Sequence, residues 1–230
     1  MKLNKKVLGS LVLALACGAA LLPKEANAQG VAETGVGIGF SSGGTTIVPG
    51  PYENQLSLIS RPTAFQFGTT NDSSETTKAY DQVVDEKQYL SAYEDRDEKT
   101  KWSVNAQMSD LKAADGATNL AATLSFNTAT VSTFKLVKDE DGMFPKIVSE
   151  LPPLVDYAGT AVQGFKKVNL EAGSTASTAV MTATADALAK GEHGGFAAEV
   201  KNVQLLVNGD QETKGKAFSG TVTWSLDDTK

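Results

Sequence analysis

The fold is decided by the segment WSVNAQMS, residues 102–109, in which apolar and polar side chains alternate at every position. Trp102, Val104, Ala106 and Met108 fall on one side of an extended chain, and the polar residues between them fall on the other. This period of two residues predicts a strand with one buried face.

A second segment near the C-terminus has the same pattern. It is FSGTVTWSL, residues 218–226, in which Val222, Trp224 and Leu226 share one side. The chain contains two tryptophans, and each opens a Trp-Ser-aliphatic triplet within such a segment. Because one tryptophan buries roughly 150–250 Å², we expect Trp102 and Trp224 to close a common core from its two ends.

The other strand-like segments are short and are separated by turn residues. Pro62 favours an edge strand or a break between two strands, and Asn208-Gly209 is a strong signal for a tight turn. No segment keeps a helical period, although residues 183–190 could form a turn or two of helix. These features predict an all-β fold, an antiparallel β-sandwich that is Ig-like or barrel-like, with short helical turns at most. The additional predicted strands cover residues 56–58, 65–67, 120–126, 134–136, 168–170, 180–184 and 203–207.

Composition divides the chain into three segments. Lysines precede an apolar run, and an Ala-Asn-Ala sequence follows it, so residues 1–28 are predicted to be a secretory signal peptide. Residues 29–52 are rich in Gly, Ser and Thr and are interpreted as a flexible lead-in or an edge segment. Residues 53–230 are assigned to one domain. No second apolar run of that length follows, so we expect no membrane span in the mature chain.

The single cysteine, Cys17, lies inside the predicted signal peptide. We therefore expect no disulfide, no thiolate chemistry and no cysteine-ligated metal site in the mature chain. Anchoring of Cys17 to lipid is the alternative, although the residues before it match a lipobox only loosely.

The chain is acidic, with a formal net charge of -6. Removal of the predicted signal peptide, which carries four lysines and one glutamate, changes this charge to -9. An acidic surface argues against binding to nucleic acid or to anionic polymers through charge alone. Attachment to such a polymer would need shaped contacts or a partner.

No set of residues predicts catalysis, so we expect no catalytic residue, no cofactor and no metal site. His193, the lone histidine, is interpreted as an exposed loop residue because glycines follow it and a catalytic triad needs rigid neighbours. The acidic runs at 94–98 and 139–141 lack the spacing of a calcium loop and are interpreted as solvated charge clusters. For Arg96, a salt bridge that holds the loop of residues 94–101 is favoured over a ligand contact.

Several blocks of the chain, taken together and in order, resemble the WxL-domain proteins of Gram-positive cell surfaces. They are LSLISRPTAFQFGTT from Leu56, Tyr89-Leu90, Glu94-Asp95-Arg96, WSVNAQMSDL from Trp102, LAATLSF from Leu120 and GTVTWSL from Gly220. The chain departs from the family pattern at Val104, which replaces leucine in the first motif, and at Lys101, where the family often has glycine. The resemblance makes Trp102, Val104, Trp224, Leu226 and Arg96 the family motif residues, with a structural or a binding role.

The resemblance implies a secreted, non-enzymatic protein that attaches non-covalently to the peptidoglycan of a Gram-positive cell wall. The chain stops at Lys230 without an LPxTG sorting signal, so covalent anchoring is not expected. The alternative is a protein-interaction subunit, held at the wall by larger WxL proteins and membrane-anchored partners. Adhesion to host matrix proteins is a third alternative. Core packing is favoured for both tryptophans over an exposed platform that stacks on wall sugars or fills a pocket of a partner.

Overall fold

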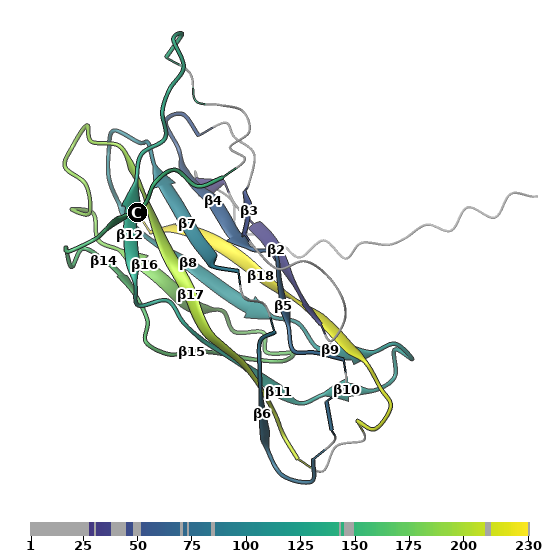
Figure 1. Cartoon of the computed structure of the whole chain (residues 1–230). Helices are drawn as coiled ribbons and strands as arrows, with labels where there is room; N and C mark the ends of the chain where they lie inside the picture. The colour runs from purple at the N-terminus through teal and green to yellow at the C-terminus, as the bar shows by residue number, and fades with distance from the viewer. Residues whose placement is uncertain are drawn as a thin grey trace, which may run out of the picture.

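The computed structural model describes residues 28–29, 31–37, 45–47, 52–69, 71–72, 74–83, 86–142, 144, 150–209 and 213–229. Within these residues the chain forms strands and no helix, and the strands make two sheets that pack face to face (Figure 1). The predicted all-β sandwich is therefore confirmed. The predicted signal peptide and Cys17 lie outside the described residues, apart from residue 28.

The strands are β1 (Ala28–Gln29), β2 (Val31–Gly37), β3 (Thr45–Ile47), β4 (Leu56–Pro62), β5 (Ala64–Gln66), β6 (Lys78–Asp81), β7 (Gln88–Glu94), β8 (Lys101–Met108), β9 (Leu111–Ala113), β10 (Asn119–Leu120), β11 (Ala122–Asn127), β12 (Val131–Phe134), β13 (Val155–Asp156), β14 (Val162–Gly164), β15 (Val168–Glu171), β16 (Thr178–Ala183), β17 (Gly194–Val207) and β18 (Phe218–Thr229).

The two sheets differ in size but share an antiparallel arrangement. The first sheet follows the order β1-β4-β7-β17-β11-β15, with β3, β6, β12 and β13 attached to that path. The second follows the order β10-β9-β18-β8-β16-β14, with β2 and β5 attached. Paired strands are antiparallel except for β1 with β4 and β2 with β5.

The two tryptophan-bearing strands, β8 and β18, are hydrogen-bonded neighbours in the second sheet (Figure 1). Their register places Trp224 opposite Ala106 and Leu226 opposite Val104. The exposed fraction is 0% for Trp224 and 3% for Trp102, and both rings belong to the main core between the sheets. The prediction that the two rings close one core is confirmed. Because Trp224 lies opposite Ala106, Trp102 is four residues further along β8. At about 3.3 Å per residue, the two tryptophans are ~13 Å apart along the strands.

Pro62 marks the point where the chain passes from the first sheet to the second. Before it, β4 pairs with β7, and after it, β5 pairs with β2. The break between two strands predicted at Pro62 is therefore confirmed. The hydroxyl of Thr34 donates to the carbonyl oxygen of Pro62 at 2.5 Å and accepts the Nε1–H of Trp224 at 2.7 Å. This chain of hydrogen bonds ties the crossing to the core.

Residues 29–52 were interpreted as a flexible lead-in or an edge segment. The described part of this segment contains the strands β2 and β3. β2 pairs with β18 over its whole length, from Val31 opposite Ser225 to Gly37 opposite Ser219, and β3 pairs with β4. The reason is that β18 has two edges: β8 takes one of them and β2 takes the other. The described part of this segment is therefore built into the sheets. The boundary of a domain at residue 53 stays a prediction.

The longest strand, β17, begins well before the predicted segment 203–207. It starts at Gly194, directly after His193, and pairs first with β7 and β12 and then with β11 and β6. His193 itself lies in the loop before β17 with its side chain 37% exposed, as predicted, but Gly194 and Gly195, which were interpreted as part of that loop, are buried in the strand. A Cβ on Gly195 would lie between 2.2 and 2.5 Å from three atoms of the Phe134 ring. The glycine is needed because an aromatic ring packs directly on the strand.

Gly195→Ala is expected to destabilise the protein by roughly 1–3 kcal/mol, because the buried Phe134 ring would have to leave its position. The matched control is Gly194→Ala in the same strand, where the nearest atom to a new Cβ is 3.7 Å away. Urea unfolding of the two variants measures the difference. Equal losses would show that the contact with Phe134 is not the cause.

Two further predictions differ from the structure. The strand expected over 134–136 lies earlier in the chain, at Val131–Phe134, where β12 pairs with residues 195–198 of β17. Residues 184–190, where a turn or two of helix was possible, form turns and no helix, with a hydrogen bond from Ala187 N–H to the Thr184 carbonyl at 3.1 Å.

A second, smaller apolar cluster covers the outer face of the first sheet. It includes side chains that alternate with core residues along the same strands, such as Ile59 in β4 and Tyr93 in β7. Leu136 and Phe144 from the connection after β12 pack on them. Burial, with a smaller contribution from the charge of Asp95, raises the pKa of Tyr93 to about 12. The irregular connection after β12 therefore covers the face of the sheet that points away from the main core.

Candidate functional site

The family motif residues are part of the fold's interior. Trp102, Val104, Trp224 and Leu226 have exposed fractions of 3%, 0%, 0% and 4%. The alternative that a tryptophan ring forms an exposed platform is therefore wrong. Any surface that contacts a ligand lies elsewhere on the molecule.

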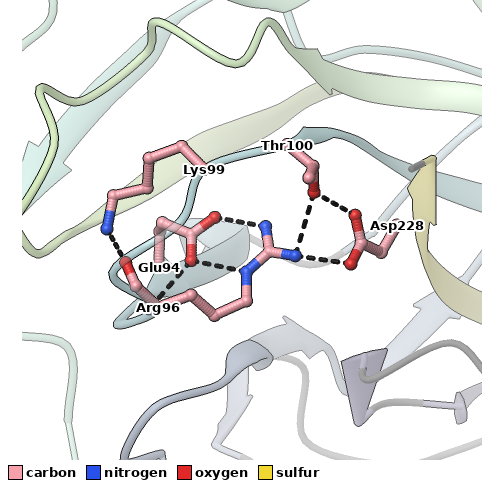
Figure 2. Close-up of polar contacts among 5 residues, drawn as sticks. All are labelled: Glu94, Arg96, Lys99, Thr100 and Asp228. Atoms are coloured by element: carbon pink, nitrogen blue, oxygen red, sulfur yellow. Dashed lines mark hydrogen bonds and ion pairs between the residues drawn. The ribbon is translucent and has the colours of Figure 1, made fainter.

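Arg96 lies between two carboxylates that come from different sheets, as Figure 2 shows. Its Nε and Nη2 donate to the two oxygens of Glu94 at 2.8 and 2.5 Å, and its Nη1 donates to Asp228 at 2.5 Å and to Thr100 at 3.0 Å. The side chains of Glu94 and Asp228 are only 3% and 2% exposed. The predicted salt bridge in the 94–101 loop is confirmed, and it also reaches β18.

The position of this network explains its structural role. Glu94 ends β7 in the first sheet, and Asp228 lies near the end of β18 in the second sheet. By binding both carboxylates, Arg96 fixes the segment between β7 and β8, in which the chain passes from the first sheet to the second just before Trp102. Hydrogen bonding to Glu94 raises the pKa of the Arg96 guanidinium. Four of the five N–H groups of an arginine side chain are engaged here. This arrangement leaves little of Arg96 to bind a ligand.

His193 lies beside a buried carboxylate, which the sequence did not indicate. Its Nδ1 is 3.2 Å from Oδ1 of Asp95, and the other oxygen of Asp95 accepts the backbone N–H of Asn54 at 2.9 Å. Over the part of the chain that the structure describes, no three His, Cys, Asp or Glu side chains come together to hold a metal ion. In the same residues, no helix has the length and apolar character needed to cross a membrane.

A groove of about 470 Å³ lies at the opposite end of β18 from Arg96. Its floor is apolar and consists of the buried side chains of Phe67, Leu120, Leu205 and Phe218. Polar and charged side chains surround this floor, among them Asp72, Lys78, Tyr80, Lys214 and Lys216.

One wall of the groove is formed by two paired strands. In the register of β6 and β17, Tyr80 lies opposite Leu205 and Lys78 lies opposite Val207. The hydroxyl of Tyr80 donates to the carbonyl oxygen of Asp72 at 2.8 Å, and this bond holds the ring in place. The Lys78 ammonium lies 5.1 Å from the centre of the Tyr80 ring. The ammonium thus lies over the ring in a cation-π contact.

Two other contacts hold the rim of the groove. A Cβ on Gly209 would lie 2.2 Å from the carbonyl oxygen of Glu75, so the turn after β17 packs tightly on the loop before β6. Lys216 Nζ donates to Thr118 Oγ1 at 2.7 Å and lies 3.6 Å from Asp115. The groove is therefore built by the same contacts that hold the end of the sandwich together.

Sequence reasoning did not find this groove, because its lining comes from several segments that are distant along the chain. Residues 71–77 are polar in sequence, and the described ones among them form a loop. The Lys78-x-Tyr80 spacing, which puts both side chains on one face of a strand, is the one local signal that could have indicated part of the wall.

Together, the buried motif, the crossing fixed by Arg96 and the groove describe a β-sandwich with a ligand-sized surface at one end. The family described as WxL domain surface cell wall-binding matches residues 45–229, and the chain belongs to this family. A search of curated proteins gave no match, and a search of solved structures gave none either. Membership associates the chain with the cell surface and with binding to the cell wall, which is not an enzymatic activity.

Proposed function

We propose that the protein is secreted and attaches non-covalently to the peptidoglycan of a Gram-positive wall, with the groove as its contact site. The observation that carries this proposal is the groove itself, because the buried tryptophans cannot make the contact. Its volume of about 470 Å³ falls in the range of roughly 300–1,000 Å³ that is usual for ligand sites. An apolar floor within a polar rim suits a sugar, whose ring faces are apolar and whose edges carry hydroxyls.

The test is co-sedimentation of the purified protein with purified peptidoglycan sacculi. The wild-type protein is expected to pellet, and Tyr80→Ala is expected to weaken binding by tenfold or more, about the 1–2 kcal/mol of a central aromatic contact. Tyr80→Phe is the matched control, because it keeps the ring and removes only the hydrogen bond to Asp72. Pelleting of the wild type no greater than background would refute direct wall binding. Equal pelleting of all three proteins would place the contact outside the groove.

A second candidate function is docking on a protein partner that is itself held at the wall. The observation that favours it is the pair of short strands that end the two sheets, β15 and β14. Among the described strands, β15 pairs with β11 alone and β14 pairs with β16 alone. A sheet edge of this kind can accept a strand from another chain. Wall association measured with and without the candidate partner separates the two functions, because direct binding needs only bare peptidoglycan.

A further inference from the structure

The groove concentrates amines on an otherwise acidic chain. Lys78, Lys214 and Lys216 all line it, against the single carboxylate of Asp72 among the described lining residues. Lys216 is already held by Thr118 and Asp115. Lys78 and Lys214 are exposed, so their ammonium groups are accessible to a ligand in the groove.

The contrast between the groove and the rest of the protein has a consequence for binding. With an expected mature charge of -9, obtained by removing four lysines and one glutamate from a chain of charge -6, the protein as a whole repels a polyanion. The two ammonium groups of Lys78 and Lys214 then give an acidic ligand one place at which its charge is attracted. Charge alone does not provide attachment, but a shaped site with two amines does.

The neighbouring groups define the rest of the ligand. The Lys78 ammonium lies over the Tyr80 ring, 5.1 Å from its centre, so a sugar that contacts Tyr80 has its substituents within reach of this amine. The floor of Phe67, Leu120, Leu205 and Phe218 requires an apolar group, such as an acetyl methyl or a sugar face. A polymer of phosphodiesters offers little apolar surface to this floor. A carboxylated, N-acetylated sugar satisfies the ring, the floor and the amines together.

We propose that the groove binds an acidic amino sugar of the wall glycan whose carboxylate is free, that is, a muramic acid without a stem peptide, with the sugar against Tyr80 and the apolar floor and its carboxylate between Lys78 and Lys214. This inference rests on the proposed function and adds the chemical class that the site selects.

The test compares two soluble disaccharides by isothermal titration calorimetry. One is N-acetylglucosamine linked to N-acetylmuramic acid, which has a carboxylate, and the other is diacetylchitobiose, which has none. The acidic disaccharide is expected to bind about tenfold more tightly at low salt, and 0.5 M NaCl should remove most of this preference. The double variant Lys78→Gln/Lys214→Gln should bind the two sugars equally. Lys166→Gln/Lys167→Gln is the matched control, because it removes the same charge from exposed lysines outside the groove and should keep the preference.

The outcomes separate this inference from the proposed function. If the wild type pellets with sacculi but binds both disaccharides equally, wall attachment stands and carboxylate recognition is overturned. If acid extraction of phosphate polymers from the sacculi abolishes pelleting, the ligand is a phosphate polymer, and the inference is again overturned. If the control variant loses the preference together with the groove variant, overall charge and not the groove is responsible. Absence of wild-type pelleting refutes the proposed function itself.

Discussion

Trp224→Ala is expected to destabilise the protein by about 3–5 kcal/mol, the usual cost of removing a buried aromatic side chain. The ring is completely buried and packs against Phe65 and Phe126, with centroid distances of 6.4 and 6.1 Å. Removal also leaves the hydroxyl of Thr34 without its donor. Since folded domains are typically stable by only 5–15 kcal/mol, the loss is a large part of the total. Urea unfolding followed by circular dichroism measures it.

Two smaller changes separate the packing of this ring from its hydrogen bond. Trp224→Phe keeps an aromatic ring and removes the N–H donor, and Thr34→Val removes the acceptor. A double-mutant cycle of these two changes gives the coupling across the hydrogen bond, for which we expect roughly 1 kcal/mol. If Trp224→Ala abolished wall binding without loss of stability, the ring would have to act as a contact surface, against its burial.

Arg96→Met is expected to cost about 3–5 kcal/mol, because it leaves two buried carboxylates without their cation. Glu94 and Asp228 are almost completely buried, and Arg96 is the cation that contacts both of them. The end of β7 and the end of β18 would then repel each other at the crossing before Trp102. Urea unfolding at neutral pH measures the loss.

The cause of this loss can be checked by removing the carboxylate charges as well. In the Arg96→Met background, Glu94→Gln with Asp228→Asn should recover a substantial part of the stability. Lys112→Met is the exposed control, because its partner Asp110 lies at 4.0 Å and both side chains are about half exposed. We expect that change to be within 1 kcal/mol of the wild type. A similar cost for Lys112→Met and Arg96→Met would contradict the role given to burial.

The elements that could be predicted from the sequence are those in which one face is buried along the whole strand. β8 is the clearest, since each of Trp102, Val104, Ala106 and Met108 is buried and each residue between them is partly exposed. β18 follows the same rule at Phe218, Val222, Trp224 and Leu226. Val104, where the resemblance leads us to expect leucine, keeps an apolar side chain in the core and lies opposite Leu226 across the two strands.

The elements that were missed have a composition that suggests a different structure. Gly194 and Gly195 suggest a loop, but they admit the ring of Phe134, a contact from a distant strand that no local pattern shows. The Gly- and Thr-containing β2 suggests a linker, but β18 supplies a free edge for it. The groove was missed for a related reason, since its wall, floor and rim come from separate segments. In each case the deciding contact is long-range.

The position of β18 has a consequence for how the chain reaches its folded state. This strand lies between β2 near the N-terminus and β8 in the middle of the chain, so it joins segments that are far apart in sequence. Contacts of such high sequence separation form slowly. Until residues 218–229 have been synthesised, β2 and β8 lack their common neighbour and Trp224 is missing from the core. For the secretion proposed above, a nascent chain would therefore lack a complete core, and hence stay able to pass through a translocation channel, until β18 has been made.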